Sequence, residues 1–85
     1  MRIISQDKET DIPYEQATLT IGNVNKETFH IDAYFGDKYF FLGAYHSLSD
    51  AKAVLWAIIA NKKAERDYYE LPGANEDLGY AYRVM

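Results

Sequence analysis

Residues 53–60 read Ala-Val-Leu-Trp-Ala-Ile-Ile-Ala, eight apolar residues in a row within a segment that otherwise has the pattern of an amphipathic helix. A helix that packs on a sheet buries only one stripe of its surface. In a chain of 85 residues, a helix that is apolar all round therefore needs a second cover from another molecule. The run predicts association, in the first place self-association as a homodimer.

The composition limits the means by which so small a chain is stabilised. Residues 1–85 are predicted to form a single domain, and the absence of cysteine excludes disulfides and cysteine-based metal sites. The chain instead contains eight Tyr, four Phe and one Trp. Tyrosine tolerates a half-wet, half-buried position, so this enrichment suits a binding surface. It equally suits a small sheet that uses tyrosine as strand filler, and both interpretations stay open.

The net charge of −4 argues against binding to nucleic acid, which favours basic domains. The N-terminal residues contain no apolar segment of signal-peptide length, and the longest apolar run is too short to cross a membrane. These features predict a cytoplasmic protein that does not associate with a membrane.

Alternation of apolar and polar residues predicts most of the strands. Residues 17–21 and 29–35 alternate with period two and flank a turn-forming segment, so they are expected to form a hairpin. Gly36 and Asp37 then form a two-residue connection suited to a type II′ turn. The next strand, residues 38–46, is apolar on both sides and is expected to be central. Shorter strands are expected at residues 2–6 and 80–84.

A single long helix is predicted between residue 48 and about residue 69. Ser47 is a suitable N-cap, and Pro72 with Gly73 ends the segment. The resulting fold is α+β: a small antiparallel sheet of four to five strands with one long helix packed on one face, in the order β-β-β-β-α-β.

The helix is predicted to have two apolar faces. At 3.6 residues per turn, the sheet-facing stripe contains Leu48, Ala51, Val54, Leu55, Ile58 and Ile59. The opposite face carries small residues beside one large anchor, a composition that allows a second helix to approach closely. The predicted partner or dimer interface consists of Ala53, Trp56, Ala57, Ala60 and Ala64.

A second candidate surface lies on the sheet and consists of aromatic side chains. It contains Tyr34, Tyr39, Phe41 and Tyr45. Such a face either contacts a protein or stacks a nucleotide-like signal, with basic residues such as Arg2, Lys38 or Arg83 at its rim. Whether it is a binding surface or buried core is left open by the sequence.

No motif predicts catalysis, a cofactor or a metal. His30, Asp32 and Tyr34 share one strand face, which could orient an imidazole against a carboxylate, but such a face is more commonly solvated and no nucleophile has a defined spacing to it. The glycines form no phosphate-binding loop, and two histidines without cysteine do not define a metal site. We therefore expect a protein that is not an enzyme and that has no cofactor.

Three segments carry a resemblance to a known group. Residues 1–7 read Met-Arg-Ile-Ile-Ser-Gln-Asp, residues 11–15 read Asp-Ile-Pro-Tyr-Glu, and residues 45–53 read Tyr-His-Ser-Leu-Ser-Asp-Ala-Lys-Ala. In these segments the chain resembles small proteins encoded by phages, prophages and conjugative elements of Firmicutes. The helix of those proteins is usually more polar than residues 53–60. The resemblance implies an accessory gene of a mobile element that acts in the cytoplasm of a bacterial host, and it implies no particular activity.

Two functions follow from these observations. The first is a non-enzymatic protein that acts by protein–protein interaction, as a homodimer or by binding a bacterial host protein, for example as an inhibitor of a defence system such as CRISPR. The alternative is a module that sequesters a small nucleotide signal on its aromatic sheet face.

Overall fold

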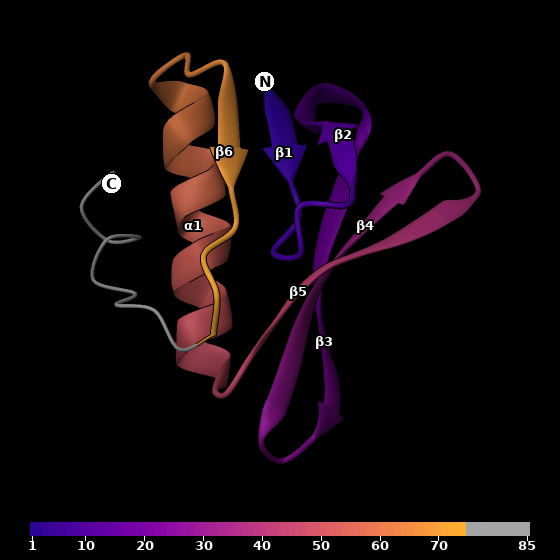
Figure 1. Cartoon of the computed structure of the whole chain (residues 1–85), viewed down its shortest axis with the longest axis vertical. Coiled ribbons are helices and arrows are strands. Elements are labelled where there is room, and N and C mark those ends of the chain that lie inside the picture. Colours follow the sequence, from indigo (N-terminus) through magenta and orange to yellow (C-terminus); the bar gives the residue numbers. More distant parts are fainter. Residues whose placement is uncertain (75–85) are drawn as a thin grey trace.

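The structure, a computed structural model, describes residues 1–74, and this part of the chain contains one α-helix and six strands (Figure 1). The fold is α+β, as predicted. The elements are β1 (Arg2–Ile4), β2 (Asp11–Pro13), the short 3₁₀ helix η1 (Tyr14–Gln16), β3 (Thr18–Asn25), β4 (Thr28–Phe35), β5 (Lys38–Tyr45), α1 (Leu48–Lys63) and β6 (Tyr68–Glu70). The strand expected at residues 80–84 lies outside the described residues.

The three long strands form an antiparallel sheet in the order β3-β4-β5, and both predicted hairpins are confirmed. Gly36 has a φ of 64°, and Phe35 pairs with Lys38 across the turn. A type II′ turn requires a positive φ at its first central residue, which glycine adopts without strain. Strand β5 was expected to be central but lies at an edge of this sheet, and β4 is the central strand.

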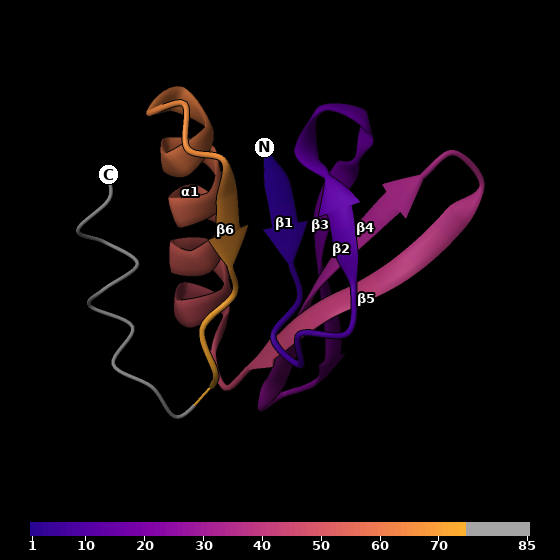
Figure 2. The same cartoon turned by 45° about the horizontal axis from the view of Figure 1, so that its top comes forward.

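The three short strands form a second sheet in the order β2-β1-β6, which the sequence did not predict. Strand β1 pairs antiparallel with β2 and parallel with β6, so that Ile3 lies between Ile12 and Tyr69. Figure 2 shows β6 between α1 and β1. The expectation of a single sheet is therefore wrong, because residues 68–70 form a strand where a continuation of the helix was predicted.

A β-bulge in β5 changes the direction of its side chains. Ile31 pairs with Gly43 and Asp32 pairs with Phe41, so Leu42 is an additional residue without a partner in the ladder. An inserted residue reverses the inside–outside alternation beyond it. Tyr45, which simple alternation placed on the same side as Phe41, is consequently buried in the core.

Helix α1 begins as predicted but ends earlier than predicted. The Ser47 hydroxyl accepts a hydrogen bond from the Asp50 backbone N–H at 3.1 Å. At the other end Glu65 adopts a φ of 59°, the Glu65 N–H donates to the Lys62 carbonyl, and the Arg66 N–H donates to the Asn61 carbonyl. This is the Schellman arrangement that commonly ends helices. Its left-handed position is usually glycine, so glutamate concealed this end in the sequence.

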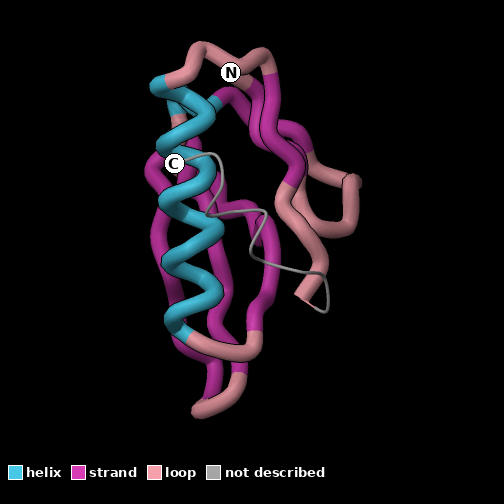
Figure 3. Tube along the Cα trace, turned by 90° about the vertical axis from the view of Figure 1, so that its left-hand side faces the viewer, coloured by secondary structure: helices cyan, strands magenta, loops and turns pink. Residues whose placement is uncertain are grey.

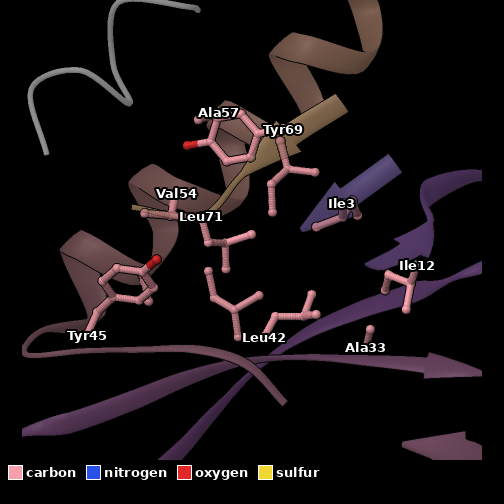
Figure 4. Packing of buried hydrophobic residues seen from close by; sticks show 12 residues of the cluster. Ile3, Ile12, Ala33, Leu42, Tyr45, Val54, Ala57, Tyr69 and Leu71 are labelled. Carbon is pink, nitrogen blue, oxygen red and sulfur yellow. The ribbon is translucent and has the colours of Figure 1, made fainter. Parts of the chain in front are cut away.

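The two faces of α1 are rotated relative to the prediction. Its buried residues are Ala51, Ala53, Val54, Ala57, Ile58 and Asn61. Ala53 and Ala57 were expected on the outer face, and their burial corrects that assignment. Figure 4 shows Ala57 beside Tyr69 of β6. The small alanine side chains thus allow close approach of a strand from the same chain instead of a second helix.

One hydrophobic core connects the helix, the larger sheet and the small sheet. The helix contacts β3, β4, β5 and β6, and Figure 3 shows it along the strands of the larger sheet. Ile3 and Ile12 of the small sheet belong to the same buried cluster as Ala33 and Leu42 of the larger one (Figure 4). Among residues 1–74, no helix has the length and apolar character needed to span a membrane.

An ion-pair network joins the end of α1 to the N-terminal segment. Glu15 accepts hydrogen bonds from the Lys62 ammonium at 2.6 Å and from the Met1 amino group at 2.8 Å. The hydrogen bond from Lys62, followed by that from Met1, lowers the pKa of the Glu15 carboxyl to about 2. These contacts are solvent-exposed, so their contribution to stability is screened by salt.

We expect the network to contribute a pH-dependent part of the stability. A carboxyl group whose pKa is lower in the folded than in the unfolded chain stabilises the fold above its unfolded pKa, here 4.5, and loses this contribution as the pH falls toward about 2. The Glu15→Gln variant should therefore show a smaller fall in urea midpoint between pH 5 and pH 2 than the wild type. Parallel pH profiles of the two proteins would contradict this expectation.

Candidate functional site

The outer face of the larger sheet carries the candidate site, because three strands present their polar and aromatic side chains there. Along β4, His30, Asp32 and Tyr34 alternate with the core residues, as the sequence predicted. Register places Thr20 of β3 and Phe41 of β5 on either side of Asp32. We call Tyr34, Tyr39 and Phe41, with Asp32 between them, the aromatic face.

The three aromatic residues remain exposed in the described part of the chain. Tyr34 is 46%, Tyr39 is 53% and Phe41 is 38% exposed. The rings of Tyr34 and Tyr39, a cross-strand pair, lie edge-to-face at 5.5 Å between centroids. The ring of Phe41 packs in a T-shaped arrangement on His30 at 4.8 Å. These contacts restrict the side chains before any partner binds, which reduces the entropy lost on binding.

Asp32 connects the strands beneath these rings. Its side chain is only 7% exposed, and its Oδ1 atom accepts a hydrogen bond from the Tyr39 hydroxyl at 2.8 Å. The hydrogen bond to Asp32 is the main reason that the pKa of Tyr39 is raised above its ordinary value, with burial as a further cause. Tyr39 is therefore neutral at physiological pH and acts as a fixed donor to the carboxylate.

Of the four residues predicted for the sheet surface, the structure brings three together. Tyr45 is separated from the others because the bulge at Leu42 directs it into the core. There its hydroxyl donates to the Pro72 carbonyl at 2.7 Å, so Tyr45 is a structural residue. The sequence carried no signal for a bulge in a strand that is apolar on both sides.

The predicted helix interface is divided between core and surface. Trp56 is half exposed and Ala64 is exposed, whereas Ala60 is partly buried and Ala53 and Ala57 belong to the interior. The face of α1 that remains outside carries a different apolar stripe, which we call the helix stripe. Its apolar members are Trp56 together with Leu48, Leu55 and Ile59, which were expected to face the sheet, and the exposed lysines Lys52 and Lys63 lie beside them.

The described residues bring together no set of groups typical of a catalytic or metal site. Within residues 1–74, no three side chains of His, Cys, Asp or Glu are placed to hold a metal ion. The ring of His30 packs on Phe41, and the Lys62 ammonium is bound to Glu15. Arg83, a predicted rim residue, lies outside the described residues, whereas Arg2 pairs with Asp11 at 2.8 Å.

A hollow of about 330 Å³ lies away from the aromatic face. Its lining residues are Gln6, Thr28, Ala44, Tyr45, His46 and Ala74. None of Tyr34, Tyr39 and Phe41 contributes to it. The exposed aromatic side chains of the aromatic face therefore do not line this hollow.

Sequence reasoning missed the roles of two residues, Gly22 beside the aromatic face and Gln6 beside the hollow. Gly22 was read only as a break in the β3 pattern, but a Cβ atom at this position would lie 3.3 Å from Asp32 Oδ2. Gln6 was read only as part of the first strand, but its side chain makes hydrogen bonds with Ala44 and Pro72. Neither role has a local sequence signature, because both depend on contacts between distant strands.

Comparison with known proteins gives no relative from which a function can be transferred. No protein-family model, no curated protein and no solved structure matches the chain.

Proposed function

We propose that this chain is a non-enzymatic protein that acts by binding another protein through its aromatic face. The observation that carries the proposal is the group of three exposed aromatic side chains on a three-stranded sheet, of which Tyr34 and Tyr39 pack on each other and Phe41 packs on His30. Tyrosine and other large aromatic residues dominate the binding energy of protein interfaces, most of all where they are already ordered in the free protein.

The resemblance in residues 1–7, 11–15 and 45–53 supports a biological setting for this function. It favours an accessory protein of a phage or other mobile element whose partner is a bacterial host protein, for example a component of a defence system such as CRISPR that it inhibits. The net charge of −4 favours a partner with a basic surface, because complementary charge accelerates association.

The position of the aromatic face, away from the hollow, favours a protein over a small signal molecule as the partner. Sites for small ligands are typically concave and enclose most of the ligand surface. The hollow of about 330 Å³ is lined by other residues. Sequestration of a nucleotide-like signal is therefore the second candidate function. A thermal-shift assay in which a nucleotide stabilises the wild type but not Tyr34→Ala would favour this function over protein binding.

We propose in addition that the helix stripe mediates weak self-association. Helix α1, with 16 residues, extends over about 24 Å at about 1.5 Å per residue. A stripe roughly 10 Å wide then buries about 240 Å² per copy, well below the roughly 800 Å² per partner of a standard stable interface. Trp56 provides the large anchor and Leu55 and Ile59 extend it. A homodimer formed by this stripe should be concentration-dependent.

The main experiment measures partner capture by full-length protein from a bacterial host extract, with bound proteins quantified by mass spectrometry. Tyr34→Ala and Phe41→Ala are expected to weaken binding of the captured partner about tenfold or more, as for residues at the centre of an interface. Tyr68→Ala is the matched control, because Tyr68 is also an exposed tyrosine but lies on β6 in the other sheet.

Self-association is separated from partner capture by a second variant, Trp56→Ala. Light scattering of the wild type at several concentrations should show a rise in mass that Trp56→Ala lacks, while partner capture stays unchanged. Trp56 is the sole tryptophan, so its fluorescence should shift to the blue as the wild type associates. If Trp56→Ala loses partner capture while both aromatic-face variants keep it, the helix stripe and not the aromatic face binds the partner.

A further inference from the structure

Asp32 is a buried carboxylate without a positively charged partner in the described chain. Its side chain is 7% exposed, yet the ion pairs among residues 1–74 involve other acidic residues, namely Asp11, Glu15 and Glu70. Burial of a charge is costly unless a counter-charge or several hydrogen bonds compensate it. The single hydrogen bond from Tyr39 uses one of about four acceptor positions on the carboxylate.

The second oxygen of Asp32 is the atom that remains available. Within residues 1–74, Oδ2 accepts no hydrogen bond, and it is not among the fully buried polar atoms, so it is reachable from solvent. Gly22 lies beside it. A Cβ atom at Gly22 would lie 3.3 Å from Oδ2, and among residues 1–74, its two chain neighbours aside, it would meet no other atom within 4 Å, so the missing side chain leaves an opening next to the carboxylate.

Aromatic rings lie on the side of Asp32 away from Gly22, whose cross-strand partner is His30. Tyr39 is held by its hydrogen bond to Asp32, and Tyr34 packs edge-to-face on Tyr39. A carboxylate beside exposed aromatic rings is complementary to a cation, since the ring faces attract positive charge and the carboxylate accepts its N–H groups. The net charge of −4 draws a basic group toward the same surface.

We propose that Asp32 Oδ2, the opening at Gly22 and the rings of Tyr34 and Tyr39 form a subsite that binds the guanidinium group of an arginine side chain on a partner protein. Arginine fits better than lysine, because its planar, weakly hydrated group stacks on aromatic rings while it donates hydrogen bonds to a carboxylate. This subsite rests on the proposed function and specifies the chemistry of the partner.

The test is an NMR titration of isotope-labelled full-length protein with N-acetyl-arginine amide. The matched probe is N-acetyl-citrulline amide, which has nearly the same shape but no charge. We expect the arginine probe to bind at least about tenfold more tightly than the citrulline probe, because it forms a charge-assisted hydrogen bond. The largest chemical-shift changes should occur at Gly22, Asp32 and Tyr39.

Two variants connect this binding to the subsite. Asp32→Asn removes the charge but keeps an oxygen that can accept the Tyr39 hydroxyl, and it should weaken arginine binding at least about tenfold. Gly22→Ala should weaken it by closing the opening. If Gly22→Ala does not fold, Asp32→Asn alone decides. Equal binding of the two probes, unchanged binding by Asp32→Asn, or equally tight binding of N-acetyl-lysine amide would each overturn the proposal.

The outcomes also separate the subsite from the proposed function. Absence of arginine binding, together with partner capture that Phe41→Ala abolishes and Asp32→Asn leaves intact, would overturn the subsite and leave the aromatic face as a protein-binding surface. Arginine binding that is lost in Asp32→Asn would support the subsite even if Phe41→Ala had no effect on the capture of any host protein.

Discussion

Replacement of Ala57 by glutamate is expected to abolish cooperative folding at room temperature. Ala57 is fully buried and lies beside Tyr69, and its carbonyl accepts a hydrogen bond from the Asn61 side chain at 2.7 Å. The variant would place a charged group in an apolar space that has no room for it. Such changes cost more than about 4 kcal/mol, which approaches the whole stability of a small domain.

Ala64→Glu provides the matched control for this substitution. Both alanines were expected on the outer face of the helix, but Ala64 is exposed at the helix end. A glutamate there should cost less than about 1 kcal/mol, mainly through its unfavourable interaction with the helix dipole. Urea unfolding followed by circular dichroism measures both variants. Similar midpoints for the two would place Ala57 at the surface and contradict the observed packing of α1.

The second large effect is expected for Gln6→Ala. The Gln6 side chain donates to the carbonyls of Ala44 and Pro72 and accepts from the Ala44 N–H, each at 3.1 Å. Its backbone N–H also donates to the carbonyl of the bulged residue Leu42 at 2.7 Å. Gln6 thereby joins β5 to the segment that follows β6. Loss of the three side-chain bonds should cost about 3 kcal/mol and lower the Tm by roughly 15 °C.

Two further variants define the cause of that loss. Gln16→Ala removes an exposed glutamine from η1 and should change stability by less than about 0.5 kcal/mol. Gln6→Glu keeps the size of the side chain but directs a carboxylate oxygen at two carbonyls, so it should be at least as unstable as Gln6→Ala. A thermal scan in which Gln6→Glu matches the wild type would show that side-chain volume, and not the hydrogen bonds, stabilises this junction.

The local features of the fold could be predicted from the sequence because neighbouring residues determine them. Alternation identified β3, β4 and β5, the Gly36 turn followed from its position between two strands, and Ser47 identified the start of α1. The helix end could not be predicted, because Glu65 occupies a left-handed position that normally identifies itself by glycine. Once that end was missed, β6 and the whole second sheet were missed with it.

The candidate site could be predicted only in part, because neighbouring residues determine the positions of only some of its side chains. Tyr34, Tyr39 and Phe41 follow simple alternation around a turn, and they meet as expected. The position of Tyr45 depends on a bulge in β5, and the burial of Ala53 and Ala57 depends on where β6 packs. These positions are set by pairing between segments far apart in the chain, which periodicity within one segment does not reveal.

The parallel pairing of β1 with β6 has a consequence for the order in which the chain folds. Strand β1 precedes the meander of β3, β4 and β5 and the whole of α1 in the chain, whereas its partner Tyr68–Glu70 follows them. Contacts between near neighbours form before such long-range ones. We therefore expect the surface that bears Tyr34, Tyr39 and Phe41 to form before β1 acquires its second neighbour.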